Sequence, residues 1–309
     1  MSQNIACVFP GQGSQSKGML AELAASYSEV EATFAEASAA LGYDLWDLVQ
    51  NDPDDKLNQT DVTQPALLTA SVAVYRVLQA QQPFTPTVLA GHSLGEYSAL
   101  VCADVLTLSD AVKLVRARGE FMQTAVPAGT GAMYAIIGLD DQAIIDICKD
   151  VAQNTGEVVA AVNFNSPGQV VIAGTKNAAE QAGAACKEAG AKRALPLAVS
   201  VPSHCELMAP AAQQLADLLD TITFSTPTIP VVNNVDVKTE SAVSAIKDAL
   251  VRQLYCPVQW TQTVSGFAAL GVTEAWEIGP GKVLTGLNKR IDKTLAYRSV
   301  NQPADLADA

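Results

Sequence analysis

Short apolar runs alternate with longer segments of helical periodicity along most of the chain. Residues 5–9, 87–90 and 274–278 have the length and the composition of strands, whereas apolar positions in residues 19–41 and 65–79 recur at the spacing of one helix face. Strands that alternate with helices predict a mainly parallel sheet covered by helices, which is an α/β core. The tail from Asn301 lacks both patterns and is expected to be disordered.

The central part of the chain has a different pattern. Four strand-like and two helix-like segments follow one another there in the order βαββαβ: 133–138, 140–151, 157–162, 169–173, 177–189 and 193–199. This order is typical of a ferredoxin-like unit. We therefore predict a ferredoxin-like subdomain over residues 128–199, inserted into a larger core made of residues 1–127 and 200–309.

A serine lies at the junction between the run at 87–90 and a helix-like run that starts at Glu96. Residues 91–95 read Gly-His-Ser-Leu-Gly, and the two glycines allow a turn sharp enough to expose the hydroxyl of Ser93. Unpaired N–H groups at the start of the helix would face an oxyanion there. The pattern is typical of the nucleophile elbow of α/β hydrolase-like cores, and a tight turn with an unreactive serine is the alternative.

The general base is predicted by elimination, because the chain contains two histidines. His92 neighbours Ser93 on a sharp turn and should point away from it. His204 ends an extended segment before a helix-like run and is left to accept the serine proton, with an ionisation expected in the usual histidine range. No carboxylate between Ser93 and His204 is an obvious third member, so an amide or a main-chain carbonyl could hold the imidazole instead.

Composition narrows the class of protein. A chain of 309 residues with 49% hydrophobic and 17% charged residues is expected to be compact and globular, and a net charge of −13 argues against nucleic acid as a partner. No apolar run of about 20 residues and no signal segment is present, so we predict a cytoplasmic protein without membrane attachment. Six scattered cysteines and two histidines argue for free thiols and against a metal site.

Six sequence blocks resemble the bacterial malonyl-CoA:acyl carrier protein transacylases, and they occur in that family's order over the entire chain. The blocks are 10–15 (PGQGSQ), 63–66 (TQPA), 91–97 (GHSLGEY), 162–169 (VNFNSPGQ), 201–204 (VPSH) and 277–281 (EIGPG). The resemblance implies a ping-pong transfer of malonyl from malonyl-CoA to the phosphopantetheine thiol of an acyl carrier protein in fatty acid synthesis. It implies no cofactor, since the phosphopantetheine belongs to the partner.

The resemblance also implies roles for individual residues. Ser93 would carry the acyl group and His204 would be its base. The main-chain N–H groups of Gln12 and Leu94 match the oxyanion hole, and Arg118 matches the arginine that holds the free malonyl carboxylate. Gln253 in 251–254 matches the amide that orients the histidine, which would account for the missing carboxylate.

An acidic carrier would be repelled by the chain's net charge, so its docking site should be a local basic patch. The candidates are Lys187, Lys192, Arg193, Lys289 and Arg290. Two other functions stay open at this point: a serine thioesterase or hydrolase that uses the same pair of residues, and a non-catalytic module that only docks a carrier protein.

Overall fold

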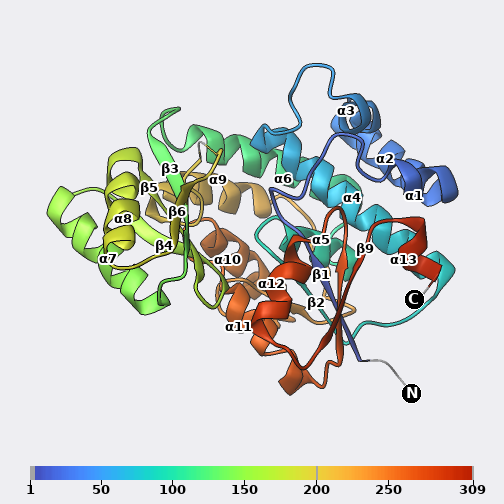
Figure 1. Ribbon diagram of the computed structural model, residues 1–309. Helices are drawn as coiled ribbons and strands as arrows, with labels where there is room; N and C mark the ends of the chain where they lie inside the picture. Colours follow the sequence, from blue (N-terminus) through green and yellow to red (C-terminus); the bar gives the residue numbers. More distant parts are fainter. Residues whose placement is uncertain (1–3, 200, 308–309) are drawn as a thin grey trace.

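The computed structural model describes residues 4–199 and 201–307, and its strands form two separate sheets (Figure 1). The larger sheet has the order β7-β2-β1-β8-β9, and every neighbouring pair in it is parallel. Its strands are β1 (Ile5–Phe9), β2 (Val88–Gly91), β7 (Val231–Val232), β8 (Glu274–Ile278) and β9 (Ala296–Val300). The predicted α/β core with a parallel sheet is confirmed.

Alternating side chains of β1 show why this sheet is buried on both faces. Cys7 and Phe9 pack into a large apolar cluster on one face, whereas Ala6 and Val8 pack into a second cluster on the other. All five residues of β1 are buried, which is typical of a central parallel strand with helices on both sides.

Eleven α-helices of the described chain surround this sheet. They are α1 (Ala21–Ser26), α2 (Ser28–Leu41), α3 (Leu45–Asn51), α4 (Thr60–Gln81), α5 (Gly95–Cys102), α6 (Leu108–Thr124), α9 (Ala209–Leu219), α10 (Val243–Gln253), α11 (Trp260–Ser265), α12 (Val283–Ile291) and α13 (Pro303–Ala307). Short 3₁₀ turns at Glu206–Met208 and Ala268–Leu270 complete this part of the chain. The helical stretch predicted at 19–41 is two helices, because Tyr27 adopts an extended conformation between α1 and α2.

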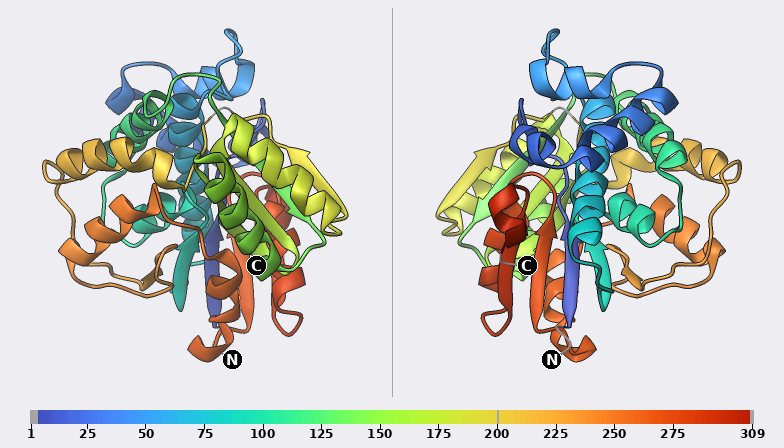
Figure 2. Two further views of the ribbon diagram at one scale, coloured as in Figure 1. Left: turned by 90° about the vertical axis from the view of Figure 1, so that its left-hand side faces the viewer. Right: turned by 90° about the vertical axis from the view of Figure 1, so that its right-hand side faces the viewer.

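The smaller sheet has the order β4-β5-β3-β6 with antiparallel neighbours, and two helices cover one of its faces (Figure 2). Its elements are β3 (Gly131–Ile137), α7 (Asp141–Thr155), β4 (Val159–Ser166), β5 (Gln169–Thr175), α8 (Lys176–Glu188) and β6 (Arg193–Pro196). This is the predicted βαββαβ order. The boundaries at 127/128 and 199/200 stay predictions, and Ser200 lies outside the described residues.

The small sheet packs against the larger unit beside the predicted site. The face of the small sheet away from α7 and α8 packs against the larger unit, where Val171 and Ala173 contact Cys205 in one apolar cluster. A main-chain bridge joins β4 to the segment before α11, with Phe164 N–H donating to the Val258 carbonyl at 3.0 Å. The insertion is therefore anchored next to His204.

The prediction that the tail from Asn301 is disordered is wrong as far as Ala307. Asp305 accepts hydrogen bonds from the main-chain N–H groups of Asn301 and Gln302, which stabilises the start of α13, and Leu306 is buried. Strand β9, which precedes this helix, was not predicted at all. Residues 308–309 lie outside the described residues.

Candidate active site

Ser93 lies on the sharp turn between β2 and α5. Its φ angle of 51° lies in the left-handed region, which costs energy for a residue with a side chain. The turn also requires glycine on both sides. A Cβ atom at Gly95 would lie 2.0 Å from the carbonyl oxygen of Phe9, and one at Gly91 would lie 1.9 Å from Gly95. The strained turn exposes the Ser93 hydroxyl at the C-terminal end of the sheet.

His204 is in hydrogen-bond contact with this hydroxyl. The distance from Ser93 Oγ to His204 Nε2 is 2.8 Å, and His204 Nδ1 lies 2.6 Å from the main-chain carbonyl oxygen of Gln253. A carbonyl can only accept, so Nδ1 carries the proton and Nε2 is free to accept the serine proton. The family resemblance implied that the amide of Gln253 orients the histidine. In the structure, the contact with His204 is made by the main-chain carbonyl of Gln253 instead.

Burial and charge hold His204 in its neutral form. Burial of the imidazole, and to a lesser extent the charges of Arg118 and His92, lower the pKa of His204 to about 3, although the hydrogen bond to the Gln253 carbonyl opposes the shift. The expectation of an ionisation in the usual histidine range is therefore wrong. The sequence identified His204 as the candidate base, but not the buried environment that sets its pKa.

Arg118 on α6 is completely buried and reaches the same serine. Its Nη1 donates to Gln64 Oε1 at 2.8 Å, and its Nη2 lies 3.0 Å from Gln253 Oε1 and 3.4 Å from Ser93 Oγ. The guanidinium also lies over the ring of Tyr97, with 5.3 Å from Cζ to the ring centroid. Burial lowers the pKa of Arg118, yet a guanidinium stays charged in proteins.

Arg116, two residues earlier on α6, faces a different direction. Its Nε lies 3.4 Å from the carboxylate of Glu120, in a half-exposed ion pair. Residues two apart on a helix point to different faces, which explains why Arg118 reaches Ser93 and Arg116 does not.

Two main-chain N–H groups beside Ser93 are available to an oxyanion. Neither the N–H of Gln12 nor that of Leu94 donates to another of the described residues. Both residues flank the elbow: Gln12 lines the serine pocket and Leu94 begins the turn into α5. Their placement agrees with the role that the family resemblance implies.

The serine opens into a pocket of about 120 Å³ between the two subdomains. The larger unit supplies the reacting pair, and the small sheet and the segment after it supply a mainly apolar wall: Met133, Asn163, Leu197 and Val199. His92 also lines the pocket, but its Nε2 lies 2.7 Å from Asn165 Oδ1 on β4. His92 is therefore committed to a bond between the subdomains, which agrees with its exclusion as the base.

Sequence reasoning missed two buried polar residues that support this site. Asn234 Oδ1 accepts the Ser93 N–H at 2.7 Å, and Asn234 Nδ2 donates to the Gly91 carbonyl at 2.6 Å, so this one amide holds both ends of the elbow. Glu96 is 3% exposed and accepts hydrogen bonds from Asn234 and Gln253. A charged residue inside the apolar run after Ser93 was the available signal for Glu96.

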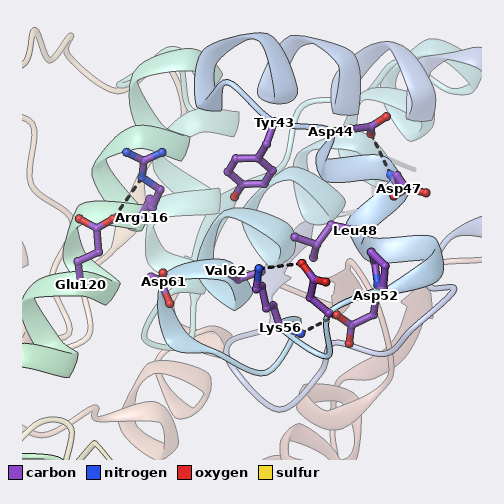
Figure 3. A pocket seen from close by; sticks show the side chains of 12 residues that line it. Tyr43, Asp44, Asp47, Leu48, Asp52, Lys56, Asp61, Val62, Arg116 and Glu120 are labelled. Atoms are coloured by element: carbon purple, nitrogen blue, oxygen red, sulfur yellow. Dashed lines mark hydrogen bonds and ion pairs between the residues drawn. The ribbon is translucent and has the colours of Figure 1, made fainter.

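A wider pocket of about 480 Å³ lies between α3, α4 and α6 and shares no lining residue with the serine pocket (Figure 3). Its wall combines acidic side chains such as Asp44, Asp47 and Asp61 with two basic ones, Lys56 and Arg116. None of the predicted catalytic residues lines it. Ser93 and His204, the candidate reacting residues, line the smaller pocket instead.

The structure brings most of the predicted docking residues to one end of the small sheet. Arg193 pairs with Ile137, and Ile137 pairs with Gln169 on the next strand, so Arg193 and Gln169 are about 10 Å apart. Arg290 on α12 donates to Gln169 Oε1 at 3.0 Å, which places it at the same end. Lys187 Nζ donates to the Lys192 carbonyl at 3.0 Å, and Lys289 is the neighbour of Arg290 on α12.

Two further findings concern the described residues alone. In residues 4–199 and 201–307, no three histidine, cysteine or acidic side chains are grouped so that they could hold a metal ion. No helix in this part of the chain is both long and apolar enough to span a bilayer. Cys205, next to the base, is buried, and burial raises the pKa of its thiol to about 11, so it is a poor competing nucleophile.

A hydrolase-like parallel sheet whose elbow serine contacts a histidine is the framework of enzymes that pass acyl groups through a serine ester. A family described as acyl transferase domain matches residues 6–297. The malonyl CoA-acyl carrier protein transacylase of Salmonella typhimurium is 67% identical over 304 residues, which is 98% of either chain. The chain therefore belongs to the acyl transferase family, in its malonyl CoA-acyl carrier protein transacylase branch, as the six sequence blocks predicted.

Solved structures support the same family assignment over nearly the whole chain. An acyl carrier protein S-malonyltransferase from Vibrio cholerae is 64% identical with a TM-score of 0.96, and the match covers 99% of both chains. A malonyl-transacylase solved in complex with a type II polyketide synthase acyl-carrier protein is 62% identical with a TM-score of 0.97, also over 99% of both chains.

Proposed function

We propose that this protein transfers a malonyl group from malonyl-CoA to the phosphopantetheine thiol of an acyl carrier protein, for use in fatty acid synthesis. The observation that carries the proposal is Arg118, a buried guanidinium that ends 3.4 Å from Ser93 Oγ and forms no ion pair with a described residue. An acyl group attached to Ser93 would place a terminal carboxylate beside this cation. The name of the Salmonella typhimurium relative states the same substrate pair.

The first half-reaction loads the enzyme. Ser93 Oγ attacks the thioester carbonyl while its proton passes to His204 Nε2, and the N–H groups of Gln12 and Leu94 stabilise the oxyanion. The tetrahedral intermediate then breaks its carbon–sulfur bond. The CoA thiolate leaves with the proton from His204, and malonyl remains on Ser93 as an ester.

The second half-reaction unloads the enzyme by the reverse sequence. The carrier thiol gives its proton to His204, and its sulfur attacks the ester carbonyl. The carbon–oxygen bond to Ser93 breaks, and His204 returns the proton to Ser93 Oγ. Every proton and leaving group is thus accounted for by the two residues and the two thiols, so we propose that the protein uses no cofactor of its own. Separately, we keep the proposal that it acts in the cytoplasm.

Intact mass measurement after addition of malonyl-CoA tests this proposal directly. We expect one malonyl adduct, located by peptide mapping at Ser93, which disappears when holo-carrier is added and reappears on the carrier. Release of free malonate in place of malonyl-carrier would indicate a hydrolase. The absence of any adduct would indicate a module that only docks the carrier, and an adduct on Cys205 would contradict the role of Ser93.

We further propose that the basic residues at the end of the small sheet bind the carrier. The double variant Lys192→Glu and Arg193→Glu should raise the apparent KM for the carrier about tenfold at low salt and weaken its salt dependence, because a favourable charge contact is replaced by repulsion. Steady-state kinetics at two ionic strengths measures both effects. The rate of self-acylation by malonyl-CoA should change by less than about twofold, since that step does not need the carrier.

A matched control separates local charge from net charge. Lys113 and Lys149 are exposed and lie outside the patch, and reversing both gives the same change in net charge. This control should leave the KM for the carrier unchanged. If both double variants raise the KM equally, or if Lys192 and Arg193 affect both half-reactions alike, the docking assignment is wrong.

A further inference from the structure

A buried carboxylate lies behind the reacting groups without touching the serine or the histidine. Glu96 is 3% exposed and lies in the first turn of α5, three residues after Ser93. Its Oε2 accepts the main-chain N–H of Asn234 at 3.0 Å and the side-chain amide of Gln253 at 2.7 Å. The proposed reaction does not use Glu96, yet an ionisable group buried this close to a reacting centre is rarely without consequence.

Gln253 joins Glu96 to Arg118. The amide Nε2 donates to Glu96, and the amide Oε1 accepts from Arg118 Nη2 at 3.0 Å. An ionised carboxylate only accepts and a guanidinium only donates, so this pair of partners fixes which way the amide faces. The main-chain carbonyl of the same residue holds His204. Gln253 therefore contacts Glu96, Arg118 and His204 at the same time.

Arg118 lacks a direct partner of opposite charge. It is fully buried, and none of the ion pairs in the described part of the chain includes it. Its Nε has no hydrogen-bond partner among the described residues either. A buried cation is costly without a compensating charge. Its hydrogen-bond chain through Gln253 ends on one carboxylate, Glu96.

We propose that Glu96 is the counter-charge of Arg118 and that, through the Gln253 amide, it sets how strongly the guanidinium binds the carboxylate of the incoming acyl group. This inference rests on the proposed function. Glu96 does not reach the substrate, so it is a positioning and specificity-determining residue and not a catalytic one. When malonyl is bound, two carboxylates share one guanidinium, and the negative form of Glu96 weakens the binding of the substrate carboxylate.

The protonation state of Glu96 then matters near neutral pH. Burial raises the pKa of Glu96 to about 7, against the hydrogen bonds from Gln253 and Asn234 and the charge of Arg118, which lower it. The charge of Asp236 after β7 also contributes to this raised pKa, and Tyr97 and Glu240 are further ionisable groups next to Glu96. A second carboxylate at Arg118 would raise the pKa of Glu96 again, because like charges repel. Malonyl should therefore be favoured over acetyl more strongly below about pH 7 than above it.

The variant Glu96→Gln tests this inference because it removes the charge and keeps an oxygen that accepts both N–H groups. We compare the ratio of kcat/KM for malonyl-CoA to kcat/KM for acetyl-CoA in the variant and in the wild type. At about pH 8.5 the variant should have a ratio about tenfold higher, since Glu96 is ionised in the wild type. At about pH 5.5 the two ratios should agree, since the wild-type carboxyl is then protonated.

Two further variants separate the effect of the Glu96 charge from the effect of its hydrogen bond to Gln253. Glu240 lines the same small cavity as Glu96 but has no hydrogen bond to Gln253, so Glu240→Gln should leave the ratio unchanged at both pH values. Glu96→Ala removes the acceptor altogether and should lower kcat for both acyl groups at both pH values, because Gln253 then loses its fixed orientation.

The outcomes are distinct. A Glu96→Gln ratio equal to that of the wild type at about pH 8.5, or changed equally at both pH values, overturns the inference. If that variant does not fold, the wild type alone decides, because its ratio must fall as the pH rises through about 7. If the wild type transfers no malonyl, the proposed function fails first. Normal malonyl transfer with a pH-independent ratio refutes only the role of Glu96.

Discussion

Replacing His204 with alanine should lower the rate of Ser93 acylation by about three to four orders of magnitude. The imidazole is the group in contact with Ser93 Oγ that can take its proton, and its Nδ1–H is already held by the Gln253 carbonyl. Loss of the imidazole leaves the oxyanion donors and Arg118 in place, so a residual rate should remain. Rapid mixing with malonyl-CoA followed by intact mass measurement gives the acylation rate directly.

His92→Gln is the matched control, since it changes the other of the two histidines and keeps a side chain able to bond Asn165. It should cost less than about tenfold. A loss below tenfold for His204→Ala would mean that a different group serves as the base.

The pH profile gives an independent check on the same residue. The pKa of His204 is lowered to about 3, so the base is neutral at every pH above about 4 and acylation should not decline between pH 8 and pH 5 on its account. Measurement in the Glu96→Gln variant removes the other ionisation of the site. A decline centred near pH 6.5, the ordinary histidine value, would contradict the buried environment seen here.

Replacing Arg118 with alanine should lower kcat/KM for malonyl-CoA by about 10²–10³-fold and leave acetyl transfer level or improved. The guanidinium can bind a carboxylate through two parallel hydrogen bonds, and because it is fully buried this contact is little screened by solvent. Acetyl lacks the carboxylate, and its transfer should gain from the removal of a buried cation. Parallel kinetics with malonyl-CoA and acetyl-CoA measures the change in preference.

Acetyl transfer also reports whether the Arg118→Ala variant is folded. Arg116→Ala is the control on the same helix, because Arg116 pairs with Glu120 at the surface and should affect neither substrate. Equal losses with malonyl-CoA and acetyl-CoA in Arg118→Ala would show that Arg118 supports the structure and that the substrate carboxylate is bound elsewhere.

Local sequence signals were sufficient to predict that Ser93 and His204 lie together and that the strands form two sheets. The elbow around Ser93 needs glycine at fixed positions for steric reasons. The elements of the βαββαβ unit follow one another directly in the sequence, so their order can be predicted from local patterns. The roles of Arg118 and Gln253 came from the family resemblance, since nothing in their own helices marks them.

The supporting network could not be predicted in the same way. Glu96 accepts hydrogen bonds from Asn234 and Gln253, which follow it in the sequence by 138 and 157 positions. Its partners are therefore defined only by the fold. The low pKa of His204 depends on burial and on Arg118, neither of which a local pattern reveals. Strand β9 was missed because its residues are mostly half-exposed and lack the alternation of a typical strand.

The hydrogen bond between His92 and Asn165 lies at the boundary between the parallel-sheet unit and the inserted unit. Ser93, His204, Arg118 and Gln253 all lie on the parallel-sheet side of that boundary, whereas the apolar pocket wall and Lys192 and Arg193 come from the inserted unit or the segment that leaves it. A graft of residues 131–196 from a relative would therefore exchange part of the wall and the basic residues that we propose to bind the carrier in one step. Such chimeras would separate the evolution of partner choice from that of acyl chemistry.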